Sequence, residues 1–277
     1  MNGAIPDPII EHDHDRDDPQ SEPSAAVDAF SAKQAAEAEE SGVPAGPKKI
    51  ASIMSHPDDA EFICGGSLAR WAEEGNEVVI VLITSGDKGS DDPDMTPEKL
   101  AATREAEQLA AAKVLGVSDV IFLRKTDGYL VPTLELRRDL VRVVRELKPD
   151  IVVCQDPTVH WADASYINHP DHRAAGEAVL AAIFPAARNR MYFPELLSEG
   201  LEPHAVREIY MAGAQTPDVA IDVTAHMPTK IAALKAHVSQ VGEFEFEQMI
   251  WDWAKESAKE FPDHGEYAET FRYFKLE

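Results

Sequence analysis

Residues 49–61 read KIASIMSHPDDAE, a short apolar run that passes directly into a charged turn beginning at His56. An apolar run of this length with a polar turn after it is typical of a buried strand in a parallel sheet. In an open α/β sheet, ligands bind beyond the carboxyl ends of the strands. The stretch therefore predicts a first strand at 49–55 and a functional site in the turn at its end.

Apolar runs and helix-like segments alternate along the rest of the chain. Further strands are expected at 77–84, 119–123, 150–154, 208–212 and 219–223, and helices at 65–74, 97–115, 134–147, 171–187, 228–240 and 245–259. The alternation predicts an α/β, Rossmann-like fold, with a mostly parallel sheet and helices on both faces. A C-terminal extension is expected to complete one edge of this sheet.

The first 47 residues differ in composition from the rest of the chain. They carry 11 acidic residues against Arg16 and Lys33, and they offer little that could be buried. A segment of this composition cannot bury enough apolar surface to offset its conformational entropy. Residues 1–47 are therefore expected to form a disordered acidic arm, and residues 48–277 the folded domain.

Charge and cysteine content exclude several classes of function. The 277 residues include 50 acidic and 26 basic ones, a net charge of −24, which argues against nucleic acid or anionic lipid as the main partner. Neither a signal peptide nor an apolar run long enough for a membrane span is found, so a cytoplasmic protein is expected. Cys64 and Cys154 lack the spacing of a zinc or redox motif and are interpreted as buried apolar residues.

Two histidine-containing turns carry the strongest chemical signal. The first is HPDDAE at 56–61, and the second is HPDH at 169–172, which follows the strand expected at 150–154. Since both turns follow strands of a parallel sheet, we expect them on the same rim, although 113 residues separate them. Imidazoles and carboxylates brought together there suit a divalent metal, with zinc favoured and one position left open for water. A single such turn would be explained by a histidine that caps a helix, but the pair favours a metal site.

Together these motifs resemble the LmbE-like (PIG-L) family of zinc-dependent de-N-acetylases, over residues 48–277. The resemblance rests on HPDDAE at 56–61 with Gly65-Gly66, Thr84-Ser85-Gly86, Arg104-Glu105 with Leu115-Gly116, HPDHRAAG at 169–176, and His237-Val238-Ser239-Gln240. The family pattern often has Glu directly after the two Asp residues. Here Ala60 intervenes, so Glu61 is given no role.

The resemblance implies a role for each motif residue. The ligands of zinc, or of another divalent metal such as Fe2+, would be His56, Asp59 and His172. Asp58 would be the general base that takes a proton from the metal-bound water, and His169 would stabilise the developing oxyanion or act as an acid. The physical reading agrees, because an Asp has an ordinary pKa of about 3.9 and is ionised at neutral pH.

Three further residues are predicted to contact the substrate: Arg104, Tyr166 and His237. Arg104 lies on the helix expected at 97–115, where an ordinary surface arginine is the alternative. Tyr166 precedes the second turn, and His237 belongs to a segment that could equally be a capped helix end. The expected partner is a small-molecule amino-sugar conjugate, and a homo-oligomer is left open because relatives form various assemblies.

The leading interpretation is a metal-dependent hydrolase that removes an N-acetyl group from an amino-sugar conjugate. One alternative is an amidase that cleaves a larger thiol conjugate by the same metal chemistry, and another is a metal-binding module without catalysis. A Rossmann nucleotide-binding module is disfavoured, because only Gly65-Gly66 is found in place of a complete G-x-G-x-x-G. A non-haem iron oxygenase would also use two His and one carboxylate.

Overall fold

Burial of the apolar run at 49–55 produces strand β1 (Lys49–Met54), which is enclosed from Ile50 onward. The computed structural model describes residues 46–161, 165–242 and 244–277. Apart from its last two residues, the acidic arm expected at 1–47 lies outside the described residues and stays a prediction. Pro47–Glu277 form one compact unit.

Within the described residues, seven strands form a single sheet. The strands besides β1 are β2 (Glu77–Thr84), β3 (Asp119–Lys125), β4 (Ile151–Gln155), β5 (Glu208–Ala212), β6 (Val219–Asp222) and β7 (Ala268–Lys275). Their order is β3-β2-β1-β4-β5-β7-β6, and the pairs from β3 to β5 are all parallel. β7 is antiparallel to both of its neighbours, β5 and β6. The mostly parallel sheet is therefore confirmed, and the C-terminal extension completes one side of it by inserting β7 next to the edge strand β6.

The order of the strands creates a topological switch point between β1 and β4. From β1 the chain proceeds outward through β2 to β3, and it then crosses back to pair β4 with the other side of β1. The connections after β1 and β4 therefore lead in opposite directions, and such a point at the carboxyl edge of a sheet is where ligands bind in open α/β folds. Both histidine turns lie at this edge.

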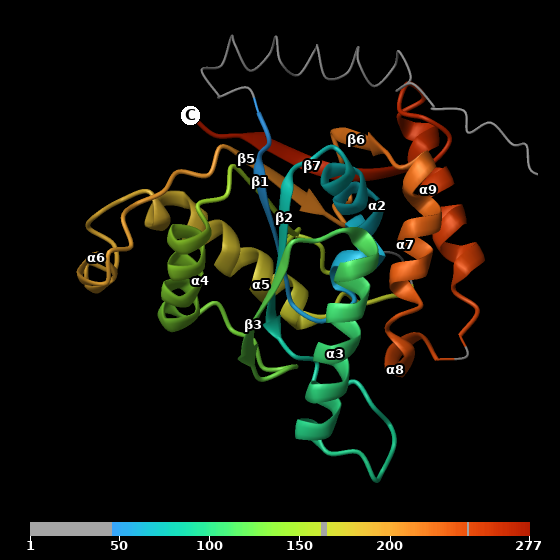
Figure 1. The fold of residues 1–277 in the computed structure, drawn as a ribbon, viewed down its shortest axis with the longest axis horizontal. Helices are drawn as coiled ribbons and strands as arrows, with labels where there is room; N and C mark the ends of the chain where they lie inside the picture. The colour runs from blue at the N-terminus through green and yellow to red at the C-terminus, as the bar shows by residue number, and fades with distance from the viewer. Residues whose placement is uncertain (1–45, 162–164, 243) are drawn as a thin grey trace, which may run out of the picture. The chain divides into compact units, whose positions relative to one another are not determined.

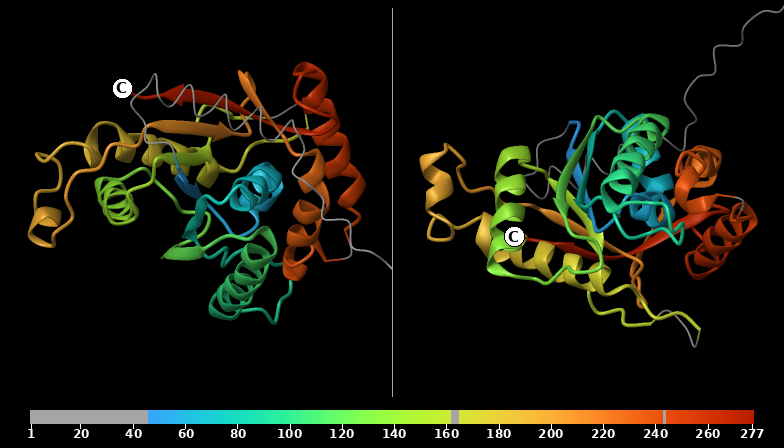
Figure 2. Two further views of the ribbon diagram at one scale, coloured as in Figure 1. Left: turned by 45° about the horizontal axis from the view of Figure 1, so that its top comes forward. Right: turned by 90° about the horizontal axis from the view of Figure 1, so that it is seen from below.

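Helices cover both faces of the sheet, as the views in Figures 1 and 2 show. The helices are α2 (Asp59–Glu73), α3 (Pro97–Leu115), α4 (Leu134–Leu147), α5 (Pro170–Ala181), α6 (Glu195–Ser198), α7 (Met227–Leu234), α8 (Val238–Val241) and α9 (Glu247–Glu260). One face packs on α4 and α5, and the other packs on α2, α3 and α7. Alternate strand residues point to opposite faces, so Ile53 belongs to the first core and Ile50 to the second.

Helix α2 begins earlier than the helix expected at 65–74. It consists of two helical parts joined at a break, and the second part corresponds to the expected helix. The first residue of α2 is Asp59, and the backbone leaves helical geometry at Cys64, where φ is −147°. A break leaves N–H groups without helical acceptors. The carboxylate of Glu269 on β7 accepts from two of them, the N–H of Gly66 at 3.0 Å and that of Ser67 at 2.7 Å. The second half of α2 is thus close to the helix that the sequence predicted.

Two other helices also depart from their expected bounds. The helix expected at 228–240 is divided, since α7 ends at Leu234 and α8 begins at Val238. The helix expected at 171–187 becomes π-helical at Ala182–Ala187, where Pro185 has no N–H to donate to an α-helical bond. In the part of the chain that the structure describes, no helix combines the length and apolar character needed to cross a membrane.

Candidate active site

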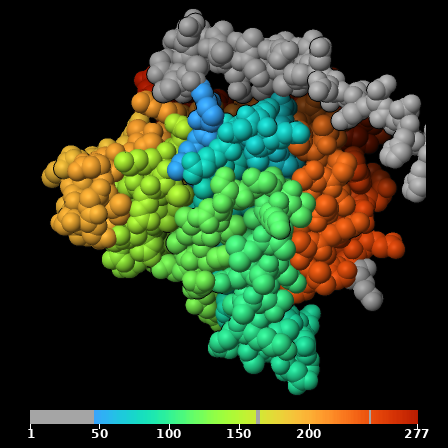
Figure 3. Space-filling view, viewed as in Figure 1, coloured from blue at the N-terminus to red at the C-terminus, as the bar shows by residue number. Residues whose placement is uncertain are grey.

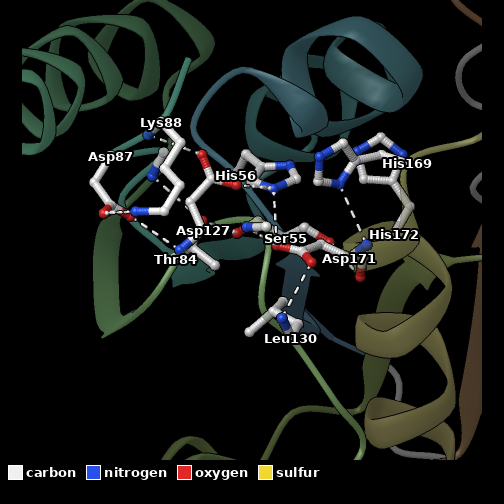
Figure 4. Close-up of polar contacts among 12 residues, drawn as sticks. Ser55, His56, Thr84, Asp87, Lys88, Asp127, Leu130, His169, Asp171 and His172 are labelled. Atoms are coloured by element: carbon white, nitrogen blue, oxygen red, sulfur yellow. Dashed lines mark hydrogen bonds and ion pairs between the residues drawn. The ribbon is translucent and has the colours of Figure 1, made fainter. Parts of the chain in front are cut away.

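The turns after β1 and β4 bring the two histidine motifs together, as the sequence predicted. His56 follows β1, whereas His169 and His172 stand at the start of α5. The ring centroid of His56 lies 4.7 Å from that of His169 and 5.3 Å from that of His172. Figure 4 shows the three rings side by side, with Asp127 on the other side of His56.

The carboxylate of Asp59 lies between the ring of His56 and the ring of His172. Its Oδ1 is 3.0 Å from Nε2 of His172, and its Oδ2 is 3.3 Å from Nδ1 of His56. Oδ2 also accepts hydrogen bonds from the backbone N–H of His56 at 2.8 Å and from Nε2 of Gln155 at 3.0 Å. These bonds fix the carboxylate so that it faces both rings.

The opposite nitrogen of each ring contacts an acceptor. Nε2 of His56 lies 3.0 Å from Oδ1 of Asp127 and 3.4 Å from Oδ2 of Asp171. Nδ1 of His172 lies 2.9 Å from Oδ1 of Asn168. Histidines that bind a metal through one nitrogen usually donate the other N–H to a carboxylate, carbonyl or water. The two nitrogens that face the carboxylate between the rings are therefore suitably oriented for a divalent metal.

A second group of side chains that could hold a metal includes the other side of the His56 ring. It consists of His56, Asp127 and Asp171, whose ligand atoms lie within 4.8 Å of one another. The carboxylate of Asp171 is fully enclosed, and it already accepts two backbone N–H groups at 2.7 and 3.1 Å (Figure 4). The side chain of His172 is 20% exposed. Because a catalytic metal needs a position open to water, the group of His56, Asp59 and His172 is the better candidate for a metal site. Asp127 and Asp171 are better suited to orienting the His56 ring.

His169 caps helix α5 through one ring nitrogen, so that the other nitrogen can carry the N–H. Its Nδ1 accepts a hydrogen bond from the backbone N–H of Asp171 at 3.2 Å. A ring nitrogen that accepts carries no proton, so the proton of the neutral ring is on Nε2. Burial, together with the charge of His56, lowers the pKa of His169 and favours this neutral form. The helix-cap interpretation is therefore correct for His169, and it is compatible with a role as a hydrogen-bond donor.

The carboxylates around His56 favour a positive charge at the site. Burial alone lowers the pKa of His56, but the charge of Asp59 and hydrogen bonds to Asp127 and Asp171 raise it to about 12. Burial raises the pKa of Asp59, yet His172 and His56 together hold it well below its ordinary value. The negative charge of these carboxylates also favours a divalent cation at the site.

Asp58 has an unusual backbone conformation beside these residues. Its φ is +89°, in the left-handed region that residues other than glycine rarely adopt. Its Oδ2 accepts a hydrogen bond of 3.1 Å from Nη2 of Arg104. Burial raises the pKa of Asp58 to about 7, although the charge of Arg104 opposes part of this rise. A carboxylate with a pKa near neutrality is matched to general-base catalysis.

The three predicted substrate contacts lie in different surroundings. Arg104 is buried, so the alternative of an ordinary surface arginine is wrong, and its guanidinium donates to two backbone carbonyl oxygens as well as to Asp58. Tyr166 is 52% exposed, on the segment that leads to the second motif. His237 is fully enclosed, and its Nε2 lies 3.5 Å from Oε2 of Glu61. Contact between the substrate and each of the three stays a prediction.

Sequence reasoning missed three side chains of the site: Asp127, Gln155 and Gln108. Gln155 is the last residue of β4, and Asp127 follows β3. The rule that polar residues at the carboxyl ends of parallel strands face the site could have found both. Gln108 lies inside α3, where its Oε1 accepts a hydrogen bond of 3.1 Å from the backbone N–H of Asp58. No local pattern distinguishes Gln108 from other polar helix residues.

Comparisons with known proteins agree with the motifs and the fold. The family described as "PIG-L: GlcNAc-PI de-N-acetylase" matches residues 51–183, which include both histidine motifs. Diacetylchitobiose deacetylase of Thermococcus kodakarensis is 32% identical over 205 residues, which cover 74% of this chain and 73% of that protein. A 1D-myo-inositol 2-acetamido-2-deoxy-alpha-D-glucopyranoside deacetylase of Kineococcus radiotolerans is 28% identical over 256 residues, which cover 70% of this chain and 69% of that protein.

A solved structure is similar over most of the chain. It is N,N'-diacetylchitobiose deacetylase from Pyrococcus horikoshii, complexed with its inhibitor MPG. The TM-score is 0.77 at 26% identity, with 92% of this chain and 95% of that chain covered. Relatives that are deacetylases disfavour the nucleotide-binding, oxygenase and non-catalytic alternatives. The motifs, the fold and the relatives agree, and the chain belongs to the PIG-L, or LmbE-like, family of de-N-acetylases.

Proposed function

We propose that this protein is a metal-dependent hydrolase that removes an N-acetyl group from an N-acetylglucosamine-type conjugate. The observation that carries the proposal is the position of Asp59, whose two carboxylate oxygens face one ring nitrogen each of His56 and His172. Asp58, the adjacent residue, supplies a second carboxylate with a different environment. Relatives that act as deacetylases on N-acetylated amino sugars support the substrate class.

The proposed metal ligands are His56, Asp59 and His172, with zinc as the proposed ion and Fe2+ as the alternative. A divalent cation held by this set would polarise the amide carbonyl and lower the pKa of a bound water molecule. Asp127 and Asn168 keep the two imidazoles in the orientation that directs one nitrogen of each toward Asp59. The ligand types, two His and one carboxylate, are those of many catalytic zinc sites.

The proton transfers are assigned to Asp58 and His169. Asp58 accepts a proton from the water that attacks the acetamide carbon, and its pKa of about 7 suits both uptake and later release of that proton. His169 donates its Nε2–H toward the carbonyl oxygen, which becomes negatively charged as the carbon turns tetrahedral. Asp58 then passes the proton to the departing nitrogen. The C–N bond breaks, and acetate and the free amine leave.

Arg104 and Tyr166 are the proposed substrate contacts, whereas the predicted third residue, His237, is fully enclosed beside Glu61. Tyr166 is the better placed of the two to meet a sugar ring directly, because about half of its surface is exposed. Arg104 is proposed to contact the substrate next to the base, because its guanidinium donates to Asp58. The expected partner is a small-molecule conjugate, and the expected location is the cytoplasm.

Metal analysis combined with acetate release tests the proposal. The purified protein is analysed for bound zinc and iron, then stripped with a chelator and reloaded with each metal. Acetate release is measured on N,N'-diacetylchitobiose, N-acetylglucosaminyl inositol and N-acetylglucosamine. We expect metal-dependent release from at least one of them. If the metal-loaded protein releases no acetate from any, the proposed function is wrong.

A further inference from the structure

Glu61 ends the first motif and lies in a chain of buried polar side chains behind Asp58. Its Oε1 accepts a hydrogen bond of 2.7 Å from Nε2 of Gln108. Oε1 of Gln108 in turn accepts the backbone N–H of Asp58 at 3.1 Å. Glu61 and Gln108 have no exposed surface. The two bonds connect a residue without an assigned role to the backbone of the proposed base.

The orientation of the Gln108 amide decides whether Asp58 is held. A glutamine side chain has an acceptor oxygen and a donor NH2 group, and exchanging them would place the NH2 group against the N–H of Asp58. Oε1 of Glu61 accepts a hydrogen bond from this amide, so Glu61 selects the orientation in which the NH2 group points toward it. The oxygen of Gln108 is then directed at Asp58, as observed.

Helix α3 contacts Asp58 at two points. Arg104 and Gln108 are four residues apart and therefore lie on the same face of the helix. Arg104 donates to the side chain of Asp58, and Gln108 accepts from its backbone. A residue with φ of +89° persists only where its surroundings hold it, so these two contacts account for the conformation of Asp58.

His237 lies next to the carboxylate oxygen of Glu61 that does not contact Gln108. Its ring is fully enclosed, with Nε2 at 3.5 Å from Oε2 of Glu61, and among the described residues neither ring nitrogen has a hydrogen-bond partner. The helix that follows, α8, is tied to α3 by Ser239, whose N–H and Oγ both donate to Glu107 at 2.7 and 2.6 Å. Figure 3 shows the segment containing α7 and α8 against α3 on this face. His237 is thereby kept beside Glu61.

We propose that Glu61 is a positioning residue, which orients the Gln108 amide and so holds Asp58 in the conformation that catalysis requires. His237 supports Glu61 in this role from the opposite side. The inference rests on the proposed function, because it assigns Glu61 to positioning the proposed general base, Asp58. It also gives a role to Glu61, which the sequence alone left without one because Ala60 separates it from the two Asp residues.

Substitution of Glu61 by two residues of similar size tests this role. Glu61→Gln keeps an oxygen that can accept from Gln108, whereas Glu61→Leu removes every acceptor. We expect Glu61→Leu to lower kcat at least about tenfold on the best N-acetylated substrate, with KM within about twofold. Glu61→Gln is expected to keep kcat within about threefold of the unmodified protein. Equal losses in the two variants would overturn the proposal, because the acceptor would then not be the decisive feature.

Amide hydrogen exchange of Asp58 gives a readout that needs no substrate. We expect its N–H to exchange at least about tenfold faster in Glu61→Leu and at the original rate in Glu61→Gln. Unchanged exchange in Glu61→Leu would overturn the proposal even if kcat falls. If the unmodified protein releases no acetate, the proposed function fails, while the exchange rates still decide the role of Glu61.

Two further variants separate positioning from general stability. Gln108→Met breaks the same chain one step nearer to Asp58, and it gives the same two readouts if Glu61→Leu does not fold. Val143→Ala removes buried methyl groups from α4 in the core on the other face of the sheet. We expect Val143→Ala to lower the unfolding midpoint while leaving kcat and the exchange of Asp58 unchanged. A loss of kcat in Val143→Ala equal to that in Glu61→Leu would assign the effect to stability and overturn the proposal.

Discussion

The guanidinium of Arg104 donates a hydrogen bond of 3.1 Å from Nη2 to Oδ2 of Asp58. The same Nη2 donates to the carbonyl oxygen of Pro57 at 2.7 Å, and Nη1 donates to that of Gly86 at 3.1 Å. One buried side chain of α3 therefore joins the turns after β1 and β2. These three hydrogen bonds stabilise the enclosed charge, although the Nε of Arg104 has no hydrogen-bond partner among the described residues. The position of the proposed base thus depends on a contact 46 residues away in the sequence.

Asp58→Asn is expected to remove catalysis and to keep the metal. Asparagine has nearly the shape of aspartate but cannot take up a proton, so we expect kcat to fall by about 10²–10⁴-fold. The proposed ligands His56, Asp59 and His172 are unchanged, so metal content should match that of the unmodified protein. Acetate release and metal analysis on the same preparation check both statements. Full activity of Asp58→Asn would exclude Asp58 as the base.

Gly86→Ala is expected to disturb the active site through Arg104. A Cβ atom at Gly86 would lie 2.3 Å from Nη1 of Arg104, and the φ of this residue is +64°. The guanidinium would have to move away from Asp58, so we expect at least about a tenfold loss of kcat. The positive φ adds a loss of more than about 1 kcal/mol in the free energy of unfolding.

The matched control for this variant is Gly75→Ala. Gly75 also has a positive φ, +88°, but a Cβ atom there meets nothing within 4 Å. It should show a similar loss of stability by urea unfolding with an unchanged kcat. If the two variants lose activity equally, the contact between residue 86 and Arg104 is not the cause.

Metal-dependent stabilisation distinguishes the two candidate ligand groups around His56. A metal that binds only the folded protein at about 100 times its dissociation constant adds about 2.7 kcal/mol to the free energy of unfolding. We expect zinc to raise the unfolding midpoint of the chelator-treated protein and Asp59→Asn to abolish the rise. Asp127→Asn should weaken zinc binding by about 10–100-fold without abolishing it, because the proposal has Asp127 orient His56 and not bind the metal. If Asp127→Asn abolished zinc binding and Asp59→Asn only weakened it, the metal would belong to the group of His56, Asp127 and Asp171.

The buried ion pair between Lys230 and Glu269 is expected to stabilise the break in α2. The Nζ of Lys230 lies 2.5 Å from Oε1 of Glu269, both side chains are about 5% exposed, and Glu269 also accepts the N–H groups of Gly66 and Ser67. Glu269→Leu leaves a buried ammonium without its counter-charge, which should cost about 3–5 kcal/mol of unfolding free energy. The double variant Lys230→Met, Glu269→Leu should lose less than the sum of the single losses in urea unfolding. Additive losses would show that the pair does not act as a unit.

Much of the fold was predictable because the pattern that specifies it is local. The run at 77–84 was predicted with the bounds of β2, and the segments at 97–115 and 134–147 with those of α3 and α4. Where a contact distant in sequence intervenes, the prediction was wrong in detail. The start of α2 is one case, because the break at Cys64 exists where Glu269 can accept the N–H groups that it exposes.

By itself, the sequence determined the alternation of strands and helices, the two histidine turns and their common rim, because apolar periodicity and motif spacing are properties of neighbouring residues. Only the tertiary structure decided which nitrogen of His56 and of His172 faces Asp59, and that Arg104 is buried against Asp58 instead of exposed on α3. These features depend on the direction of side chains after helices pack on the sheet. The orientation of the His56 ring is set by Asp127, which lies in a different turn of the chain, so no local pattern connects the two residues.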